Sequence, residues 1–316
     1  MNLTYSFAVT TRKATLPLVA AAAVAMLLGA APEAKASAIA YSNLGIANFQ
    51  VFNSAGDQYD ASDFTNLAVG NYTNANANLD GSGISDDDLS GGASDVPLQC
   101  LGAGCAGIGQ NDFSQQAGGV FSRGDANLDG AIITGLGGAS SATANTVGEL
   151  RIDSSTASNG ATVGTTTDFA FALQTSDTIT FEFDATPYLD VALADGTGQT
   201  QASIAFSITI SDETGLEVWS WAPNGSTDLG NGESSDPFSL NTSRGQLTEG
   251  QKLYNPGTGA FSATSVMLAG GQVYTLSIAH ESETSGSFTA VPEPATLLML
   301  GAGLLGLGVA GRRRKA

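Results

Sequence analysis

The second half of the chain alternates between apolar and polar residues over short segments, which is the period-two pattern of half-buried β-strands. The clearest alternations are 178–183 (TITFEF), 203–211 (SIAFSITIS) and 216–221 (LEVWSW). The last two flank the turn sequence Asp-Glu-Thr-Gly at 212–215 and predict a β-hairpin. The same pattern predicts further strands at 149–153, 168–173 and 188–194.

A second strand pair is predicted at 261–268 and 272–279, joined by Ala269, Gly270 and Gly271, and an opening strand or strand pair at 38–53. Many short strands separated by turn residues favour a mainly β protein. We therefore expect a β-sandwich of jelly-roll type.

Two segments lack clear strand signals. Residues 54–148 hold most of the Asn, Asp and Gly clusters and few long apolar runs, so they are predicted as a loop-rich insert. Because the segment is too long for one surface loop, we expect it to contain short strands or turns that the pattern does not place. Residues 282–290 (SETSGSFTA) are interpreted as a short polar spacer. The predicted extracellular domain is then 37–281.

The N-terminus has the organisation of a secretory signal peptide. Arg12 and Lys13 precede an apolar stretch at 14–31, and small residues then allow cleavage after position 36 or 38. Residues 1–36 are thus predicted to engage the secretion machinery as a helix and to be removed by signal peptidase. The alternative is an uncleaved membrane anchor.

The C-terminus has three parts in a fixed order: Pro292, Glu293 and Pro294; the uncharged apolar run 295–311; and Arg312, Arg313, Arg314 and Lys315. At about 1.5 Å of rise per residue the apolar run is just long enough for one transmembrane helix. The cationic cluster favours a cytoplasmic end, which leaves the bulk of the chain outside the inner membrane.

This three-part tail, residues 291–316, resembles the PEP-CTERM sorting signal of exported proteins in Gram-negative bacteria that make exopolysaccharide. The resemblance implies a transient single-pass membrane form, recognition by the membrane protease-transpeptidase exosortase, and a mature protein at the cell surface or in the extracellular matrix. An ordinary tail anchor is the alternative. Two prolines also keep the segment before the apolar run extended, as a protease cleft requires.

The predicted mature part is strongly acidic. Residues 37–291 contain four cationic side chains and 28 carboxylates, which gives a formal charge of −24. This balance argues against nucleic acid and anionic membrane surfaces as partners, because both are bound by clustered cations. It permits divalent cations, and it keeps an exported protein soluble.

Cys100 and Cys105 are the only two cysteines, and they flank Leu-Gly-Ala-Gly. In an exported protein such a pair favours a local disulfide. A metal site would need further ligands, and the spacing is not that of a C-x-x-C redox motif.

A short repeat is the best candidate for a metal site. Ala-Asn-Leu-Asp-Gly occurs at 77–81 and at 126–130, and with flanking residues both copies match the first half of an EF-hand-like calcium loop. The candidate calcium ligands are Asn76, Asn78, Asp80 and Asp87 in the first copy and Asp125, Asn127 and Asp129 in the second. The alternative is two Asx turns.

Sequence motifs of catalysis are absent, and we predict that the protein is not an enzyme. His280, the only histidine, lies at a predicted strand end, and acidic pairs such as Glu182 with Asp184 or Glu213 with Glu217 have no diagnostic spacing. Trp219 and Trp221 share one face of a strand. They form either a glycan-stacking platform or part of the core, and core packing is favoured.

Three functions remain. The leading hypothesis is a structural or adhesive surface protein associated with exopolysaccharide or a biofilm matrix. A carbohydrate-binding module predicts that Trp219, Trp221 or Tyr274 is exposed beside Asn or Asp side chains. An exported jelly-roll hydrolase requires two carboxylates that face each other across a cleft.

Overall fold

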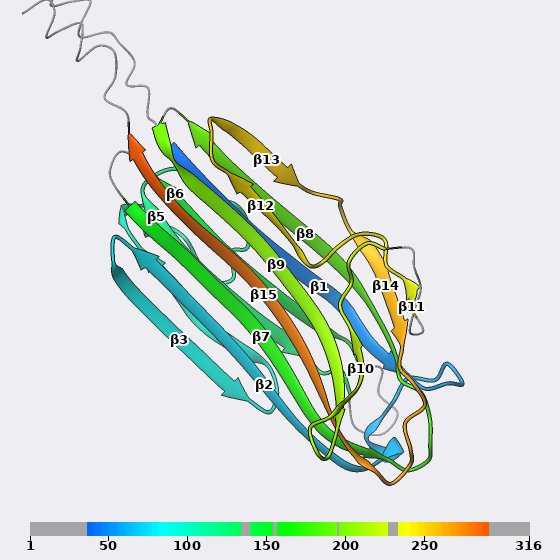
Figure 1. Cartoon of the computed structure of the whole chain (residues 1–316). Helices are drawn as coiled ribbons and strands as arrows, with labels where there is room; N and C mark the ends of the chain where they lie inside the picture. Colours follow the sequence, from blue (N-terminus) through cyan, green and yellow to red (C-terminus); the bar gives the residue numbers. More distant parts are fainter. Residues whose placement is uncertain (1–36, 134–139, 154–156, 195, 227–232, 291–316) are drawn as a thin grey trace, which may run out of the picture. The chain divides into compact units, whose positions relative to one another are not determined.

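The computed structural model describes residues 37–133, 140–153, 157–194, 196–226 and 233–290 (Figure 1). These described residues form one compact unit in which two antiparallel sheets pack as a sandwich. The predicted signal helix and transmembrane helix lie outside the described residues. Within the described ranges, no helix has the length and apolar character needed to span a membrane.

The first sheet has eight strands in the order β11-β14-β8-β1-β6-β5-β4, with β13 also paired to β8. Their bounds are β1 (Ser37–Phe52), β4 (Ser94–Leu101), β5 (Phe121–Gly130), β6 (Ala142–Ile152), β8 (Thr180–Ala194), β11 (Glu233–Ser235), β13 (Gly250–Tyr254) and β14 (Gly259–Thr264).

The second sheet has seven strands in the order β10-β9-β15-β7-β2-β3, with β12 also paired to β9. Their bounds are β2 (Phe64–Leu79), β3 (Ser82–Ser90), β7 (Ala157–Leu173), β9 (Gly196–Asp212), β10 (Glu217–Trp221), β12 (Thr242–Gln246) and β15 (Val273–Ala290). Two short 3-10 turns are η1 (Ala61–Asp63) and η2 (Ala103–Cys105).

The chain crosses repeatedly between the sheets, since β6, β7, β8 and β9 follow one another in sequence but alternate between the two. The core therefore forms from alternate residues of strands that are distant in sequence. Phe183 shows this, because its ring stacks on Phe261 of the same sheet at 5.3 Å between centroids and contacts Phe206 of the opposite sheet at 4.8 Å. These findings confirm a mainly β sandwich, whereas the jelly-roll subtype stays a prediction.

The segment 54–148, predicted to be loop-rich with strands that the pattern does not place, is mostly strand. This segment contains β2, β3, β4, β5 and the start of β6. In β2 the strand alternation is present, but its inward residues are small: Ala75 and Ala77 are each 1% exposed, between outward asparagines. A period-two pattern whose buried members are alanines has little hydrophobic contrast, which is why it resembles loop sequence.

The prediction of a polar spacer at 282–290 was wrong, because these residues complete β15. The strand pairs with β7 as far as Phe288 and with β9 as far as Ala290. Its inward side chains include Ser282 and Thr284, both at most 1% exposed. Polar residues on the buried face concealed the strand from a hydrophobicity pattern.

One of the two predicted hairpins is confirmed. Strands β9 and β10 pair antiparallel, with Glu217 opposite Ser211. The second predicted pair was wrong: β14 pairs with β8 in the first sheet, while β15 lies in the second sheet. Both strands have a buried face, and pattern alone cannot assign such a strand to a sheet.

Strand β8 joins two segments that were predicted as separate strands around Pro187. It pairs with β14 through residues 180–185 and with β13 through 189–193. Pro187 thus falls in the gap between the two partner strands on that side, where the missing N–H of a proline is tolerated.

Candidate functional site

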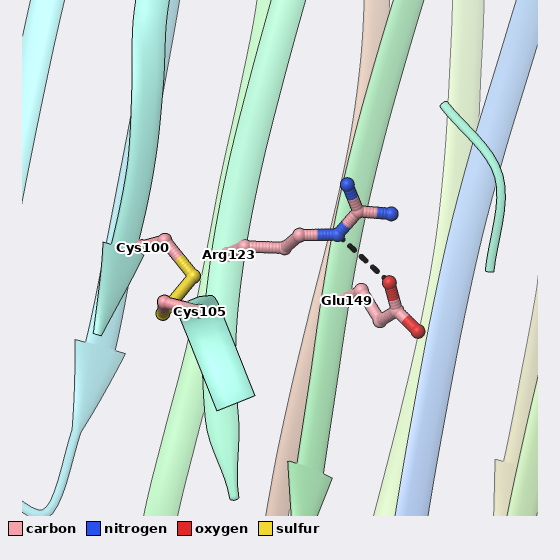
Figure 2. Close-up of a disulfide and its surroundings, with 4 residues drawn as sticks. All are labelled: Cys100, Cys105, Arg123 and Glu149. Atoms are coloured by element: carbon pink, nitrogen blue, oxygen red, sulfur yellow. Dashed lines mark hydrogen bonds and ion pairs between the residues drawn. A yellow bond between two sulfur atoms is a disulfide. The ribbon is translucent and has the colours of Figure 1, made fainter. Parts of the chain in front are cut away.

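The most elaborate polar arrangement surrounds the loop at 102–120, between β4 and β5. The Cys100–Cys105 disulfide ties the start of this loop to the end of β4 (Figure 2). The two Cα atoms are 5.9 Å apart. The predicted local disulfide is confirmed. Gly102 has φ of +115°, and a Cβ there would lie 2.3 Å from the Val120 carbonyl oxygen, so only glycine fits this ring.

A buried ion pair underlies this loop. Arg123 of β5 and Glu149 of β6 are register partners, and the Arg123 Nε lies 2.8 Å from the Glu149 Oε2, with exposures of 0% and 1% (Figure 2). The Arg123 Nη1 and Nη2 donate to the carbonyl oxygens of Asp112 and Ser114, at 2.6 and 2.5 Å. The second Glu149 oxygen accepts from the Gln116 backbone N–H at 2.9 Å. The pair therefore holds the loop against the sheet.

The electrostatics of this cluster follow from burial. Burial raises the pKa of the Glu149 carboxyl, and Arg123 acts against that rise. Burial likewise raises the pKa of the Tyr41 hydroxyl, which donates to the Phe113 carbonyl oxygen. These groups form hydrogen bonds with one another and with the backbone of the loop. The arrangement therefore positions the loop, and the side chains of this cluster offer no free nucleophile or base.

The second copy of the predicted calcium repeat belongs to this face. Asp125 is fully buried, its Oδ2 accepts from the Asn111 backbone N–H at 2.7 Å, and burial raises its pKa to about 6. Asn127 accepts from Asn145 at 3.1 Å, and Asp129 accepts from the Gly130 N–H. These three side chains follow one another along β5 and serve separate partners.

The first copy lies in the β2–β3 hairpin. Asn76 and Asn78 belong to β2, Asp80 adopts a left-handed turn conformation with φ of 53°, and Asp87 on β3 is opposite Asn74. Alternate strand residues are about 6.6 Å apart, so the register spreads these donors along the hairpin. Calcium ligands must converge at about 2.3–2.6 Å from one ion.

The predicted EF-hand-like loop is therefore not what either copy forms, because strand geometry separates the donors. Among the residues that the structure describes, no group of three or more His, Cys, Asp or Glu side chains is placed to hold a metal ion. The turn interpretation fits the first copy, where Gly81 follows Asp80 with φ of 77°.

Trp219 and Trp221 belong to the core, because both rings are buried, at 4% and 3% exposure. Trp219 stacks on Phe181 with ring centroids 5.5 Å apart, and Trp221 contacts Phe183 at 5.8 Å. Tyr274 is 5% exposed. The favoured interpretation of the two tryptophans, core packing, is therefore the one that the structure supports, and the glycan-stacking platform is not formed.

His280 lies in the core between the sheets, at 2% exposure. Its Nε2 is 2.8 Å from the Leu44 carbonyl oxygen and 2.9 Å from the Thr146 Oγ1, which also contacts the Ser282 hydroxyl at 2.8 Å. Burial lowers the pKa of His280 to about 4, so the ring is neutral at physiological pH.

This neutral histidine predicts a pH dependence of stability. The unfolded imidazole takes up a proton below pH 6.5, whereas the folded one does so only near 4, so stability falls as the pH decreases between these values. The expected contribution is about 3 kcal/mol, at 1.4 kcal/mol per pKa unit. Urea unfolding measures the free energy of unfolding of the wild type and of His280→Gln from pH 7 to 4. Below pH 6.5 we expect the wild type to lose stability relative to the variant.

Asp125 acts in the opposite sense, because its raised pKa lets the folded state take up a proton before the unfolded one does. It is present in both proteins of this comparison and cancels in their difference. A difference between wild type and His280→Gln that does not vary with pH would contradict the assignment.

The acidic pairs do not form a facing arrangement. Glu182 and Asp184 lie two residues apart on the outward face of β8, where Asp184 accepts from the Asn48 amide at 2.8 Å. Glu213 lies in the β9–β10 turn, and Glu217 accepts from the Ser220 hydroxyl.

Sequence reasoning missed the Arg123–Glu149 pair. The two residues are 26 positions apart, and only the register of β5 with β6 places them side by side. The one available signal was the scarcity of cations, which makes each of the four basic residues between 37 and 291 a candidate for a specific partner.

Comparison with known proteins identifies the C-terminal segment. Residues 290–315 match the family model of the PEP-CTERM protein-sorting motif. This motif implies an exported surface protein that is processed by exosortase. The match covers only this segment, and it begins at Ala290, the residue at which β15 ends.

No curated protein matches the sequence as a whole. Among solved structures, that of infectious bursal disease virus Gx strain has 12% identity and a TM-score of 0.11 over 84% of this chain and 69% of that chain. The VP2 subviral particle of the same virus has 11% identity and a TM-score of 0.10 over 83% of this chain and 82% of that chain. At such scores no property is transferred to this chain.

Proposed function

We propose that the protein is a structural or adhesive component of an exopolysaccharide-rich surface matrix, without catalytic activity. Residues 1–36 act as its signal peptide, and the apolar run 295–311 spans the membrane until exosortase acts. The fold proposed for this role is a sandwich of jelly-roll type.

The observation that carries this proposal is the direct junction between the last strand and the sorting motif. Strand β15 lies between β7 and β9 and runs to Ala290, where the motif begins. The sorting motif is thus continuous with an internal strand of the sandwich. Such a connection suits a domain that is to be held at a surface.

The chemistry of the described residues supports a non-catalytic role. The sole histidine is neutral and buried, and the strongest ion pair binds a loop to its own sheet. The Glu182 and Asp184 carboxylates project from the same strand rather than from two elements on either side of a cleft.

Fractionation of the host culture tests the matrix assignment. We expect the mature protein to sediment with the extracellular polysaccharide of the wild-type host, and to move into the cell-free medium or the bare cell surface when polysaccharide synthesis is deleted. An exported protein without a sorting motif is the control, and its distribution should not change. An unchanged distribution of this protein in the deletion strain would overturn the assignment.

A further inference from the structure

A polar groove of about 410 Å³ lies at one edge of the sandwich, where β12 and β13 run close together (Figure 1). Strand β12 pairs with β9 of the second sheet, and β13 pairs with β8 of the first sheet. The groove is therefore bounded by both sheets. Its volume is within the range of small-ligand sites in proteins.

The lining combines amides, hydroxyls and a single charge. It consists of Gln199, Thr200, Gln201, Gly245, Gln246, Leu247, Thr248, Lys252 and Ser285. The predicted mature part of the chain carries 28 carboxylates, yet none lines this groove. A site without carboxylates does not suit a hard cation, whereas a mixture of donors and acceptors suits a ligand rich in hydroxyl groups.

The strand register explains how the groove is open. Gln201 is opposite Ser285 on one side and Gly245 on the other, and all three are exposed. Because Gly245 has no side chain, space remains beside the Gln201 amide. Leu247, 73% exposed, adds an apolar surface at the turn after β12.

Two buried polar residues lie beneath the groove. Thr200 and Gln246 are register partners, 2% and 6% exposed. Because side chains alternate between the two faces of a strand, these two point away from the face that carries Gln201 and Ser285. They therefore support the floor of the groove and leave the exposed amides and hydroxyls to contact a ligand.

From these features we propose that the groove binds a segment of an uncharged glycan, with amides and the Lys252 ammonium group as partners for its hydroxyls and Leu247 against the carbon face of a ring. The Lys252 Nζ donates to the Gly245 carbonyl oxygen at 2.8 Å, which holds it in the groove. A polyanionic glycan is disfavoured because the domain carries a formal charge of −24. This inference rests on the proposed matrix role, since it names the molecule that the sandwich would contact.

Affinity electrophoresis of the protein purified from its host tests the groove. The gels contain dextran, galactomannan, or the uncharged or anionic fraction of the host's own matrix polysaccharide. We expect retardation by at least one uncharged polysaccharide. Retardation by none of them, or by the anionic fraction alone, overturns the inference.

Variants locate the site. Gln201→Leu should weaken binding at least tenfold, whereas Ala205→Leu, which places the same side chain four residues on along the exposed face of β9, should not change it. Thr200→Val should raise Tm by removing a buried hydroxyl without a hydrogen-bond partner, and should leave binding unchanged because this side chain points away from Gln201.

If binding is unaffected by Gln201→Leu, the groove is not the site. A protein that remains with the matrix in culture but binds no uncharged glycan refutes this inference and leaves the proposed function standing. A protein that does not sediment with the matrix polysaccharide refutes the proposed function. The electrophoresis then tests independently whether the groove binds a glycan.

Discussion

Replacing Glu149 by glutamine is expected to lower the free energy of unfolding by about 3 kcal/mol, because the Arg123 guanidinium is left buried without an anionic partner. Glutamine keeps the shape of the side chain, so no cavity contributes. A loss of this size is a large part of the stability of an ordinary domain. Urea unfolding with the slope and midpoint fitted separately gives the free energy.

The loop provides a second readout. Because Arg123 donates to the carbonyl oxygens of Asp112 and Ser114, Arg123→Met should release the loop as well as destabilise the sandwich. We expect chymotrypsin to cleave after Phe113 faster in this variant than in the wild type under native conditions. The double variant Arg123→Met/Glu149→Leu should recover part of the loss in a double-mutant cycle, since it leaves no unpaired buried charge.

Glu249→Gln is the matched control, because Glu249 is exposed and such surface changes stay within about 0.5 kcal/mol. If Glu149→Gln unfolds at the same urea concentration as Glu249→Gln, the buried pair does not stabilise the fold. Unchanged cleavage after Phe113 in Arg123→Met would mean that the other contacts of the loop, such as the hydrogen bond from the Tyr41 hydroxyl to the Phe113 carbonyl oxygen, are sufficient to order it.

Replacing Pro292, Glu293 and Pro294 by alanines is expected to abolish processing almost completely. The chain should then accumulate in the inner membrane with Arg312 to Lys315 still attached, because the apolar run before them retains it. Three alanines also permit helix where prolines keep the backbone extended for a protease. Intact mass and fractionation of the wild type and the variant measure both effects.

A host strain without exosortase should reproduce this phenotype with the unchanged chain. The control replaces Ser285 and Ser287, seven and five residues before Pro292 in β15, where the sorting motif is untouched. Normal removal of the C-terminus in the alanine variant would contradict the role of the motif. A wild-type protein that keeps its last residues in the inner membrane would mean a permanent anchor.

Features that depend on short segments could be predicted from the sequence. Cys100 and Cys105 are five residues apart, so a disulfide needs only a loop that closes on itself, and the β9–β10 hairpin depends on a turn between two alternating segments. The sorting motif is likewise a local pattern of prolines, apolar residues and cations. A protease recognises the extended segment with the prolines, and a membrane accommodates the apolar run as a helix.

Side-chain environments were harder to predict, because they depend on partners far along the chain. Trp219 and Trp221 share a face in any strand, but only the packing of β10 over Phe181 and Phe183 decides that this face is buried. Strand β2 escaped notice because alanines suffice to fill the space between its sheet and the other, so burial there needed no large hydrophobic side chain.

The amino-acid sequence by itself thus determined the export and sorting of this protein, its acidic character, its disulfide and its β class, since each follows from local pattern or composition. Only the tertiary structure decided the buried Arg123–Glu149 pair and the groove between β12 and β13. Both arise where strands distant in sequence become neighbours, and the register that brings them together is set by the burial of the whole sandwich rather than by any one segment.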